Sequence, residues 1–244
     1  MQKYSKLILA FTAKKSNVEI HRHSAFQIVY TIDNNFKTLI ENKDHNNVFG
    51  FVIRPQVAHS CLCNNSDLIV VNIEAYSILG RLIDKQLSES HSHIFSTNEE
   101  FDTFFFHLKH HSYSNFLQFL NSDMFSIHPI DDRVKKSIEY IENNFKSESV
   151  SIPEIANHVT LSASRLAALF KQQTGSSISK YLLWTRLRNA VVLILNNKNV
   201  SLTQIALESG FYDSSQMNKY MYQMFGVSPS KLRQKSELIQ FLDI

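Results

Sequence analysis

The apolar positions in the N-terminal third of the chain follow a strand-like pattern. Three runs rich in β-branched and aromatic residues cover Phe26–Ile32, Val48–Ile53 and Asp67–Glu74, and polar stretches such as DNN, NKDHNN and CNNSD separate them. Runs of this composition between Asn- and Asp-rich turns predict β-strands. Their spacing, roughly ten to twenty residues, favours a small antiparallel barrel or sandwich.

From Tyr76 onward the pattern becomes helical. The segments SILGRLIDKQL and FDTFFFHLKHHSYSNFLQFLNSDMF space their apolar residues for helices, including Phe101, Phe104, Phe105, Leu108, Phe116, Phe119 and Leu120. One or two helices packed on the β domain are expected, and a homodimer seam is the alternative use of these aromatic residues. Pro129 opposes a continued helix, whereas Asp131 and Asp132 suit the start of a new one. The sequence thus predicts a first domain over 1–128, with strands to about residue 75 and helices over about 76–125, and a second over 131–236.

The second domain contains an internal repeat. IANHVTLSASR from Ile155 and IALESGFYDSSQ from Ile205 match at an offset of 50 residues. After one inserted residue the offset becomes 51, and it aligns Ser164 with Ser215, Leu166 with Met217, Phe170 with Met221, and Gly175 with Gly226. A repeat at a fixed period indicates two copies of one supersecondary unit.

Each copy has the features of a helix-turn-helix. Ser151 and Ser201 suit the N-cap of a short first helix. Ala156 and Ala206 are small enough to let a second helix cross closely. The connecting turn is VTLS in the first copy and SGFY in the second, where Gly210 can supply the positive φ that such a turn needs. The copies therefore predict two helix-turn-helix units.

The exposed face of the second helix in each copy carries side chains that suit DNA. Gln and Asn can pair with adenine edges, Arg and Lys with guanine or phosphate, and hydroxyl groups with either. The candidates are Ser162, Ser164, Arg165 and Lys171 in the first copy, and Ser214, Ser215, Gln216, Asn218, Lys219 and Tyr222 in the second. The alternative, ordinary hairpins with solvated polar residues, fits a tandem pair less well than a single copy.

A long helix without a breaker is predicted between the copies, over Tyr181–Asn197. One turn of DNA spans ~34 Å, so a rigid spacer would let both second helices enter successive major grooves on one face of the duplex. The predicted partner is double-stranded DNA.

Charge and composition support this division. Residues 131–244 contain 14 Lys and Arg against 10 Asp and Glu, whereas residues 1–130 contain 11 against 12. A basic excess in the C-terminal half fits phosphate binding. The apolar part of the N-terminal segment ends at Lys14, too early for a secretory signal, and no apolar run approaches the ~20 residues of a membrane helix. We therefore expect a cytoplasmic protein that does not bind membranes.

The C-terminal motifs resemble those of the AraC/XylS family of bacterial transcription regulators. The resemblance covers about Asp132–Lys235 and rests on EIANHVTLSASRLAALFKQQTGSSISKYL, RLRNAVVLIL and IALESGFYDSSQMNKYMYQMFGVSPSKLR. The family signature is met by Ala206, Gly210, Phe211, Ser215, Met217, Met221, Gly226, Ser228, Pro229 and Arg233. It implies a sequence-specific DNA-binding regulator, more often an activator than a repressor, that also contacts RNA polymerase.

Some positions depart from the family pattern. Met217 and Met221 stand where phenylalanine is usual, and Tyr222 replaces a usual lysine. In the first copy, Ala167 and Ala168 occupy positions that the family often directs toward bases. We expect the second copy to discriminate bases more strongly, with packing and backbone contacts from the first. The alternative is that these alanines contact thymine methyl groups.

The N-terminal segments HRHSAFQIVYTIDN and VIRPQVAHSC resemble the cupin-like effector domain of the same family. This resemblance implies an α+β chain whose first domain is a small cupin-like barrel with flanking helices. Such a domain binds a small-molecule effector or a regulatory protein, or dimerises. His21, His23 and Gln27 share strand parity, and so do His59 and Cys61, so these five are the candidate effector-binding residues.

A metal site formed by the same histidines is the less favoured alternative. Imidazole and thiolate groups are ligands that zinc, copper and iron accept. A site of His21, His23, His59 and Cys61 would suit a cupin-type metal-dependent enzyme or a metal sensor with an attached DNA-binding module. However, Gln27 replaces the usual glutamate, and the sequence contains no paired carboxylates, Gly-rich phosphate loop or nucleophile constellation. We therefore predict no cofactor and no enzymatic activity.

Overall fold

The computed structural model describes residues 8–14, 17–106, 130–147 and 149–241. The chain divides into two compact units. One comprises Met1–His128 together with Glu237–Ile244, and the other comprises Pro129–Ser236. Phe116, Phe119 and Leu120, which were candidates for a dimer seam, lie outside the described residues.

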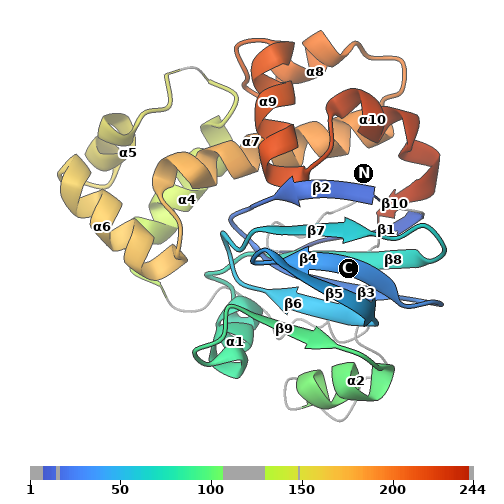
Figure 1. Cartoon of the computed structure of the whole chain (residues 1–244). Helices are drawn as coiled ribbons and strands as arrows, with labels where there is room; N and C mark the ends of the chain where they lie inside the picture. The colour runs from blue at the N-terminus through green and yellow to red at the C-terminus, as the bar shows by residue number, and fades with distance from the viewer. Residues whose placement is uncertain (1–7, 15–16, 107–129, 148, 242–244) are drawn as a thin grey trace. The chain divides into compact units, whose positions relative to one another are not determined.

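The described part of the N-terminal unit contains ten strands in two antiparallel sheets (Figure 1). The strands are β1 Ile8–Lys14, β2 Asn17–His21, β3 Phe26–Thr31, β4 Phe36–Ile40, β5 Lys43–Val48, β6 Gly50–Ile53, β7 His59–Leu62, β8 Asp67–Ile73, β9 Ser92–Phe95 and β10 Ile239–Phe241. The six-stranded sheet has the order β10-β1-β8-β3-β6-β9, and the four-stranded sheet has the order β2-β7-β4-β5. Of the two expected arrangements, the sandwich is confirmed and the barrel is not, because no strand pair joins the two sheets among the described residues.

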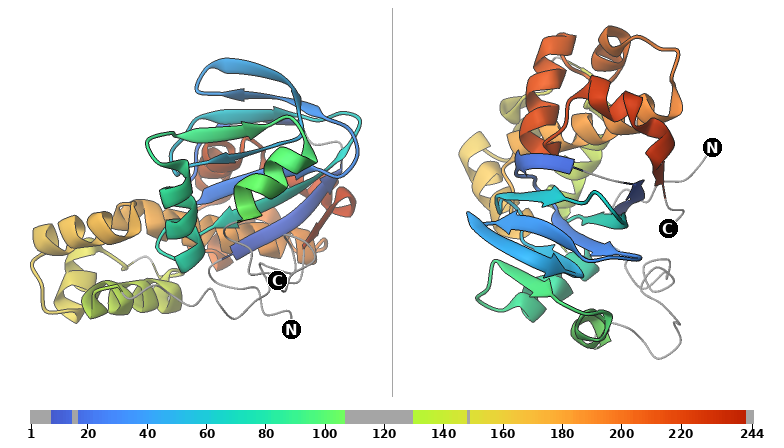
Figure 2. Two further views of the ribbon diagram at one scale, coloured as in Figure 1. Left: turned by 90° about the horizontal axis from the view of Figure 1, so that it is seen from below. Right: turned by 45° about the vertical axis from the view of Figure 1, so that its right-hand side comes forward.

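The N-terminal unit has three layers, because the six-stranded sheet is apolar on both faces. One face, which includes Ile28 and Val71, packs against helix α1 (Ile78–Leu87) and helix α2 (Asn98–Phe106). The opposite face, which includes Val29, packs against the four-stranded sheet. The views in Figure 2 show the helices and the four-stranded sheet on opposite sides of the larger sheet. Alternating residues of β3 thus serve two cores.

Strand β9 corrects the prediction of helices throughout 76–125. It lies between α1 and α2 and pairs with β6 at the edge of the six-stranded sheet. His93 is therefore a strand residue, and its ring stacks on Phe104 with centroids 4.9 Å apart. Phe101 and Phe105 are buried in the core, so these two do not form an exposed dimer seam.

The C-terminal unit is helical, and its described helices are labelled α4 to α10 in Figure 1. Their bounds are α4 Asp132–Asn144, α5 Ile152–His158, α6 Ala163–Thr174, α7 Ile178–Asn196, α8 Leu202–Glu208, α9 Ser214–Phe225 and α10 Pro229–Gln234. A short 3₁₀ turn, Ser236–Leu238, then leads into β10. No helix in the described segments has the length and apolar character needed to cross a membrane.

Candidate nucleic-acid interface

Two helix pairs, α5 with α6 and α8 with α9, form the predicted helix-turn-helix units. Ala156 and Ala206, on the first helix of each pair, are at most 1% exposed. Their methyl groups leave room for the second helix to approach. In the second pair, Met217 and Met221 are fully buried, so they occupy the core positions that Leu166 and Phe170 fill in the first.

The two turns share one backbone path. In the first, Leu161 N donates to Ala156 O, and in the second, Phe211 N donates to Ala206 O, both at 2.9 Å. The residue before each donor has a positive φ, which is 54° at Thr160 and 82° at Gly210. The prediction for Gly210 is confirmed. The first copy instead places a β-branched residue in the left-handed region, at a cost of roughly 1–2 kcal/mol.

The second helix of each unit, here called the recognition helix, begins at a side-chain cap. Ser162 accepts from Arg165 N at 3.3 Å, and Asp213 accepts from Gln216 N at 2.7 Å. The Gln216 side chain has a local role as well, because its Oε1 accepts from Tyr212 N. This leaves the amide N–H groups of Gln216 for DNA and reduces its ability to pair with both adenine groups.

Most of the predicted DNA contacts lie on the surface of their recognition helix. The exposed members are Ser162, Ser164, Arg165, Lys171, Ser215, Asn218, Lys219 and Tyr222, whereas Ser214 and Gln216 are half-buried. Ser214, Ser215 and Asn218 also line one recess of about 300 Å³ at the start of α9. The structure therefore places three predicted contacts of the second copy side by side.

Tyr212 is a further candidate that the sequence analysis did not include. It is 74% exposed, directly beside the start of α9. Its neighbour Phe211 is 3% exposed. The signal was available in the sequence, because two aromatic residues in succession in a tight turn cannot both be buried beneath it.

Polar contacts within the C-terminal unit hold helix α7 both to α4 and to the second helix-turn-helix unit. Toward α4, Glu142 Oε1 accepts from Tyr181 OH at 2.9 Å, from Thr185 Oγ1 at 3.3 Å and from Arg188 Nη2 at 2.7 Å. Toward the second copy, Asn189 Nδ2 donates to Ser209 Oγ at 3.1 Å, in the turn before Gly210. These bonds suit α7 to the role of a fixed spacer.

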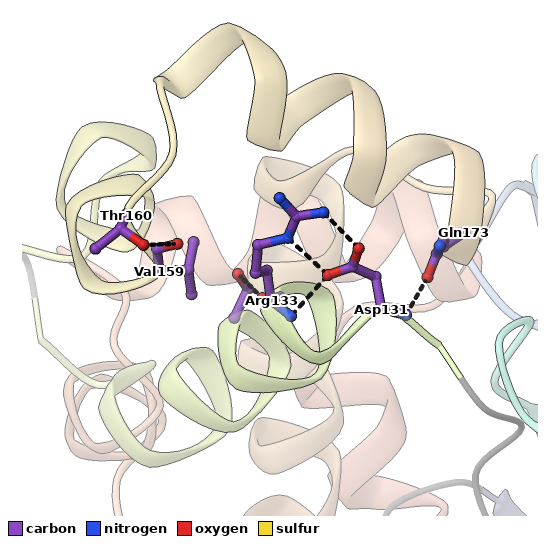
Figure 3. A network of polar contacts seen from close by, with 6 residues as sticks. Asp131, Arg133, Val159, Thr160 and Gln173 are labelled. Atoms are coloured by element: carbon purple, nitrogen blue, oxygen red, sulfur yellow. Dashed lines mark hydrogen bonds and ion pairs between the residues drawn. The ribbon is translucent and has the colours of Figure 1, made fainter.

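A second network fastens α4 to the first recognition helix (Figure 3). Asp131 caps α4 and forms an ion pair with Arg133, with Nη2 to Oδ2 at 2.6 Å. Its backbone N–H donates to Gln173 Oε1 of α6 at 2.7 Å. The hydrogen bonds and the charge of Arg133, with a smaller contribution from the charge of Arg165 on α6, lower the pKa of Asp131 to about 2.

Only some of the candidate effector-binding residues in the N-terminal unit lie close together. His21, His23 and His59 lie together, and Gln27 makes a side-chain hydrogen bond with His23. Cys61 is not in this group. Its thiol is buried, and burial raises its pKa well above the usual range. The strand-parity argument for His23 is wrong, because His23 follows the end of β2 and lies in the loop before β3.

Comparisons with known proteins agree with the helix-turn-helix geometry. Residues 155–235 match the family profile described as "Helix-turn-helix domain". The arabinose operon regulatory protein of Escherichia coli is 32% identical over 109 residues, which are 44% of this chain and 37% of that protein. The transcriptional activator RhaS of Escherichia fergusonii is 36% identical over 104 residues, or 43% of this chain and 37% of RhaS.

The C-terminal unit thus contains a helix-turn-helix domain of the AraC type, and this domain is what the chain shares with these relatives. This AraC-type domain accounts for the sequence matches, and the chain spans little more than a third of the length of these relatives. ToxT from Vibrio cholerae resembles the chain in fold over both units, with a TM-score of 0.58 at 14% identity, covering 94% of this chain and 99% of ToxT. A likeness at this identity concerns the fold alone.

Proposed function

We propose that the chain is a sequence-specific DNA-binding regulator of transcription. The observation that carries this proposal is the pair of equivalent helix-turn-helix units on one anchored spacer, α7. Each recognition helix starts at a capped, exposed turn, which is where such helices contact base edges and phosphates. The relatives are named as regulators of operons and as an activator, so activation is the favoured outcome.

The second recognition helix would supply most of the base discrimination. Asn218 and Lys219 can donate hydrogen bonds to base edges or phosphates. The Ser215 hydroxyl group can donate or accept such bonds. In the first copy, the exposed Ala168 offers only a methyl group, while Arg165 and Lys171 suit phosphates. The first copy would then hold the register of the complex.

The N-terminal unit would modulate this activity. Its partner would be a small-molecule effector or a regulatory protein, and His21, His23, Gln27, His59 and Cys61 are the candidate contacts. One ToxT structure contains a bound unsaturated fatty acid, but its 11% identity to this chain gives no reason to expect the same ligand. RNA polymerase contact and homodimerisation belong to the proposal too, and the site of action would be the cytoplasm, where promoter DNA lies. We propose no enzymatic activity.

Selection from a random double-stranded DNA library tests the proposal. The full chain should enrich one motif with two conserved clusters centred about 10–11 base pairs apart, because successive major grooves are one helical turn apart. Replacing Asn218 and Lys219 by alanine should reduce the preference for that motif over random DNA. Lys198→Ala, which removes one positive charge outside both recognition helices, is the matched control. Recovery of unselected sequences by the wild-type protein would contradict the proposal.

A further inference from the structure

Three histidine rings converge within the N-terminal unit. The ring centroids are 4.0 Å apart for His21 and His59, 5.1 Å apart for His23 and His59, and 5.7 Å apart for His21 and His23. One nitrogen of each ring lies within 4.8 Å of the others, and each residue is at most 6% exposed. They are the only group of three or more potential His, Cys, Asp or Glu ligands among the described residues.

Strand pairing and the connection after β2 bring the three rings together. Strands β2 and β7 are antiparallel, and their register places His21 opposite His59. The chain leaves β2 immediately after His21 and enters β3 at Phe26, and this connection carries His23 against the other two rings. The group therefore depends on pairing between segments that are distant in sequence.

Backbone carbonyl groups select one tautomer for all three rings. The Nδ1 atoms lie 2.8 Å from Glu19 O, 3.0 Å from Ala25 O and 3.0 Å from Val57 O for His21, His23 and His59 respectively. A carbonyl oxygen can only accept, so each Nδ1 must carry the hydrogen. In a neutral ring this leaves the lone pair on Nε2, and a carbonyl bond at Nδ1 is the usual support of a metal-bound histidine.

Burial also disfavours the charged form of each ring. Burial lowers the pKa of His21 to about 4 and that of His23 to about 3, and it lowers the pKa of His59 well below the usual value. The His59 Nε2 atom is buried and has no hydrogen-bond partner among the described residues. Such an atom costs roughly 1–3 kcal/mol, a cost that a phenylalanine in the same place would not carry. Such an atom at His59, beside two further buried imidazole rings, is poorly explained by packing alone.

We propose that His21, His23 and His59 form a binding site for a late first-row divalent metal ion such as zinc. Three imidazole nitrogens without a carboxylate suit zinc, cobalt or nickel, whereas calcium and magnesium require oxygen ligands. A zinc–nitrogen bond of ~2.1 Å implies nitrogens ~3.4 Å apart in a tetrahedral site, so the rings would close inward by about 1 Å. Water or a small anion would take the fourth position.

Metal titration of the full chain, prepared without a histidine tag and stripped with a chelator, tests this site. Cobalt should bind at one ion per chain and produce the visible absorption of a low-coordinate site. Zinc should displace it and raise the midpoint of thermal unfolding, because a ligand that binds only the folded state stabilises it. Neither measurement involves DNA, so the result is independent of the proposed function.

The decisive variant is His59→Phe, since the ring of Phe51 already packs 6.0 Å from His59 and the surrounding core is apolar. It should fold, bind cobalt more than about 100-fold more weakly, and lose the zinc-dependent stabilisation. His91→Ala is the matched control, because this side chain is 64% exposed and its Nδ1 bonds Glu41 Oε1 away from the group. The site is excluded if wild-type protein binds no cobalt, or if His59→Phe binds it as tightly as His91→Ala does.

Discussion

The two helix-turn-helix units have the same backbone frame and different exposed surfaces. Both bury an alanine under the crossing, Ala156 or Ala206, and both end the recognition helix at a left-handed glycine, Gly175 or Gly226. These positions are fixed by close packing and by backbone conformation, which few residues satisfy. The exposed positions carry no such constraint. They can therefore change from Ala168 in the first copy to Lys219 in the second without disturbing the fold.

Backbone strain in the two units is found at their turns. Gly210 adopts φ 82° in contact with the end of α4, whereas Thr160 adopts φ 54° at the equivalent place and remains exposed. Position 210 thus requires glycine for two reasons, the positive φ and the lack of room for a Cβ atom. The other tolerates threonine at a conformational cost, because nothing crowds its side chain.

Substitutions at the two turn residues should change stability in opposite directions, and the one at Gly210 should have the largest effect of all. A Cβ on residue 210 would lie 2.5 Å from Phe145 O and 2.9 Å from Arg186 Nε, so Gly210→Ala should destabilise the C-terminal unit by about 3 kcal/mol or more. Thr160→Gly should instead stabilise it by roughly 0.5–1 kcal/mol. Urea unfolding followed by helical circular dichroism measures both. Equal tolerance of the two changes would show that the turns are interchangeable.

The two anchors of α7 should differ in strength. Glu142→Ala removes the acceptor of three side chains and leaves the charge of Arg188, whose side chain is 13% exposed, without that carboxylate, so a loss of about 2–3 kcal/mol is expected. Asn189→Ala removes one neutral bond to the second copy and should cost about 1 kcal/mol. The same unfolding measurement ranks them. If Asn189→Ala proved the more damaging, α7 would be fixed mainly by the second copy.

The ion pair between Asp131 and Arg133 at the start of α4 should give the smallest effect, and this effect should disappear in acid. Asp131→Asn keeps an N-cap side chain but loses the ion pair with Arg133. Because folding lowers the Asp131 pKa from 3.8 to about 2, its stabilising contribution is present above pH 3.8 and disappears as the pH falls toward 2. The advantage of wild type over Asp131→Asn should therefore shrink across that interval. An advantage that stayed constant would assign the contribution to the cap alone.

The sequence predicts the parts of this fold that have a strong local pattern. Strands β3, β6 and β8 are apolar, and the repeat reveals both helix-turn-helix units. Strand β5 (KDHNNV) was missed because it is a polar hairpin strand at the edge of the smaller sheet, with its pairing supplied by β4. Strand β10 was missed because its pairing with β1 joins opposite ends of the chain.

The sequence predicts which candidate positions are exposed more readily than it predicts the contacts that their side chains make. The exposed positions of the recognition helices follow from helical spacing, but the local bond that engages Gln216 depends on the cap at Asp213. The spacing of that capping pair is visible in DSSQ, so the competition could have been foreseen. By contrast, the contact of Gly210 with Phe145 O and the approach of His23 to His59 arise from tertiary structure alone.

Base-by-base selection with Lys171→Ala and Asn218→Ala tests the central claim, an unequal division of labour between the two copies. Lys171→Ala should weaken binding to all sequences and reduce the slope of log affinity against log salt by about 1, leaving the motif unchanged. Asn218→Ala should relax the preference at one or two positions within a single cluster of the motif, with a loss of about 1–3 kcal/mol of discrimination there. The account is contradicted if Asn218→Ala leaves every position of the motif intact while Lys171→Ala alters it.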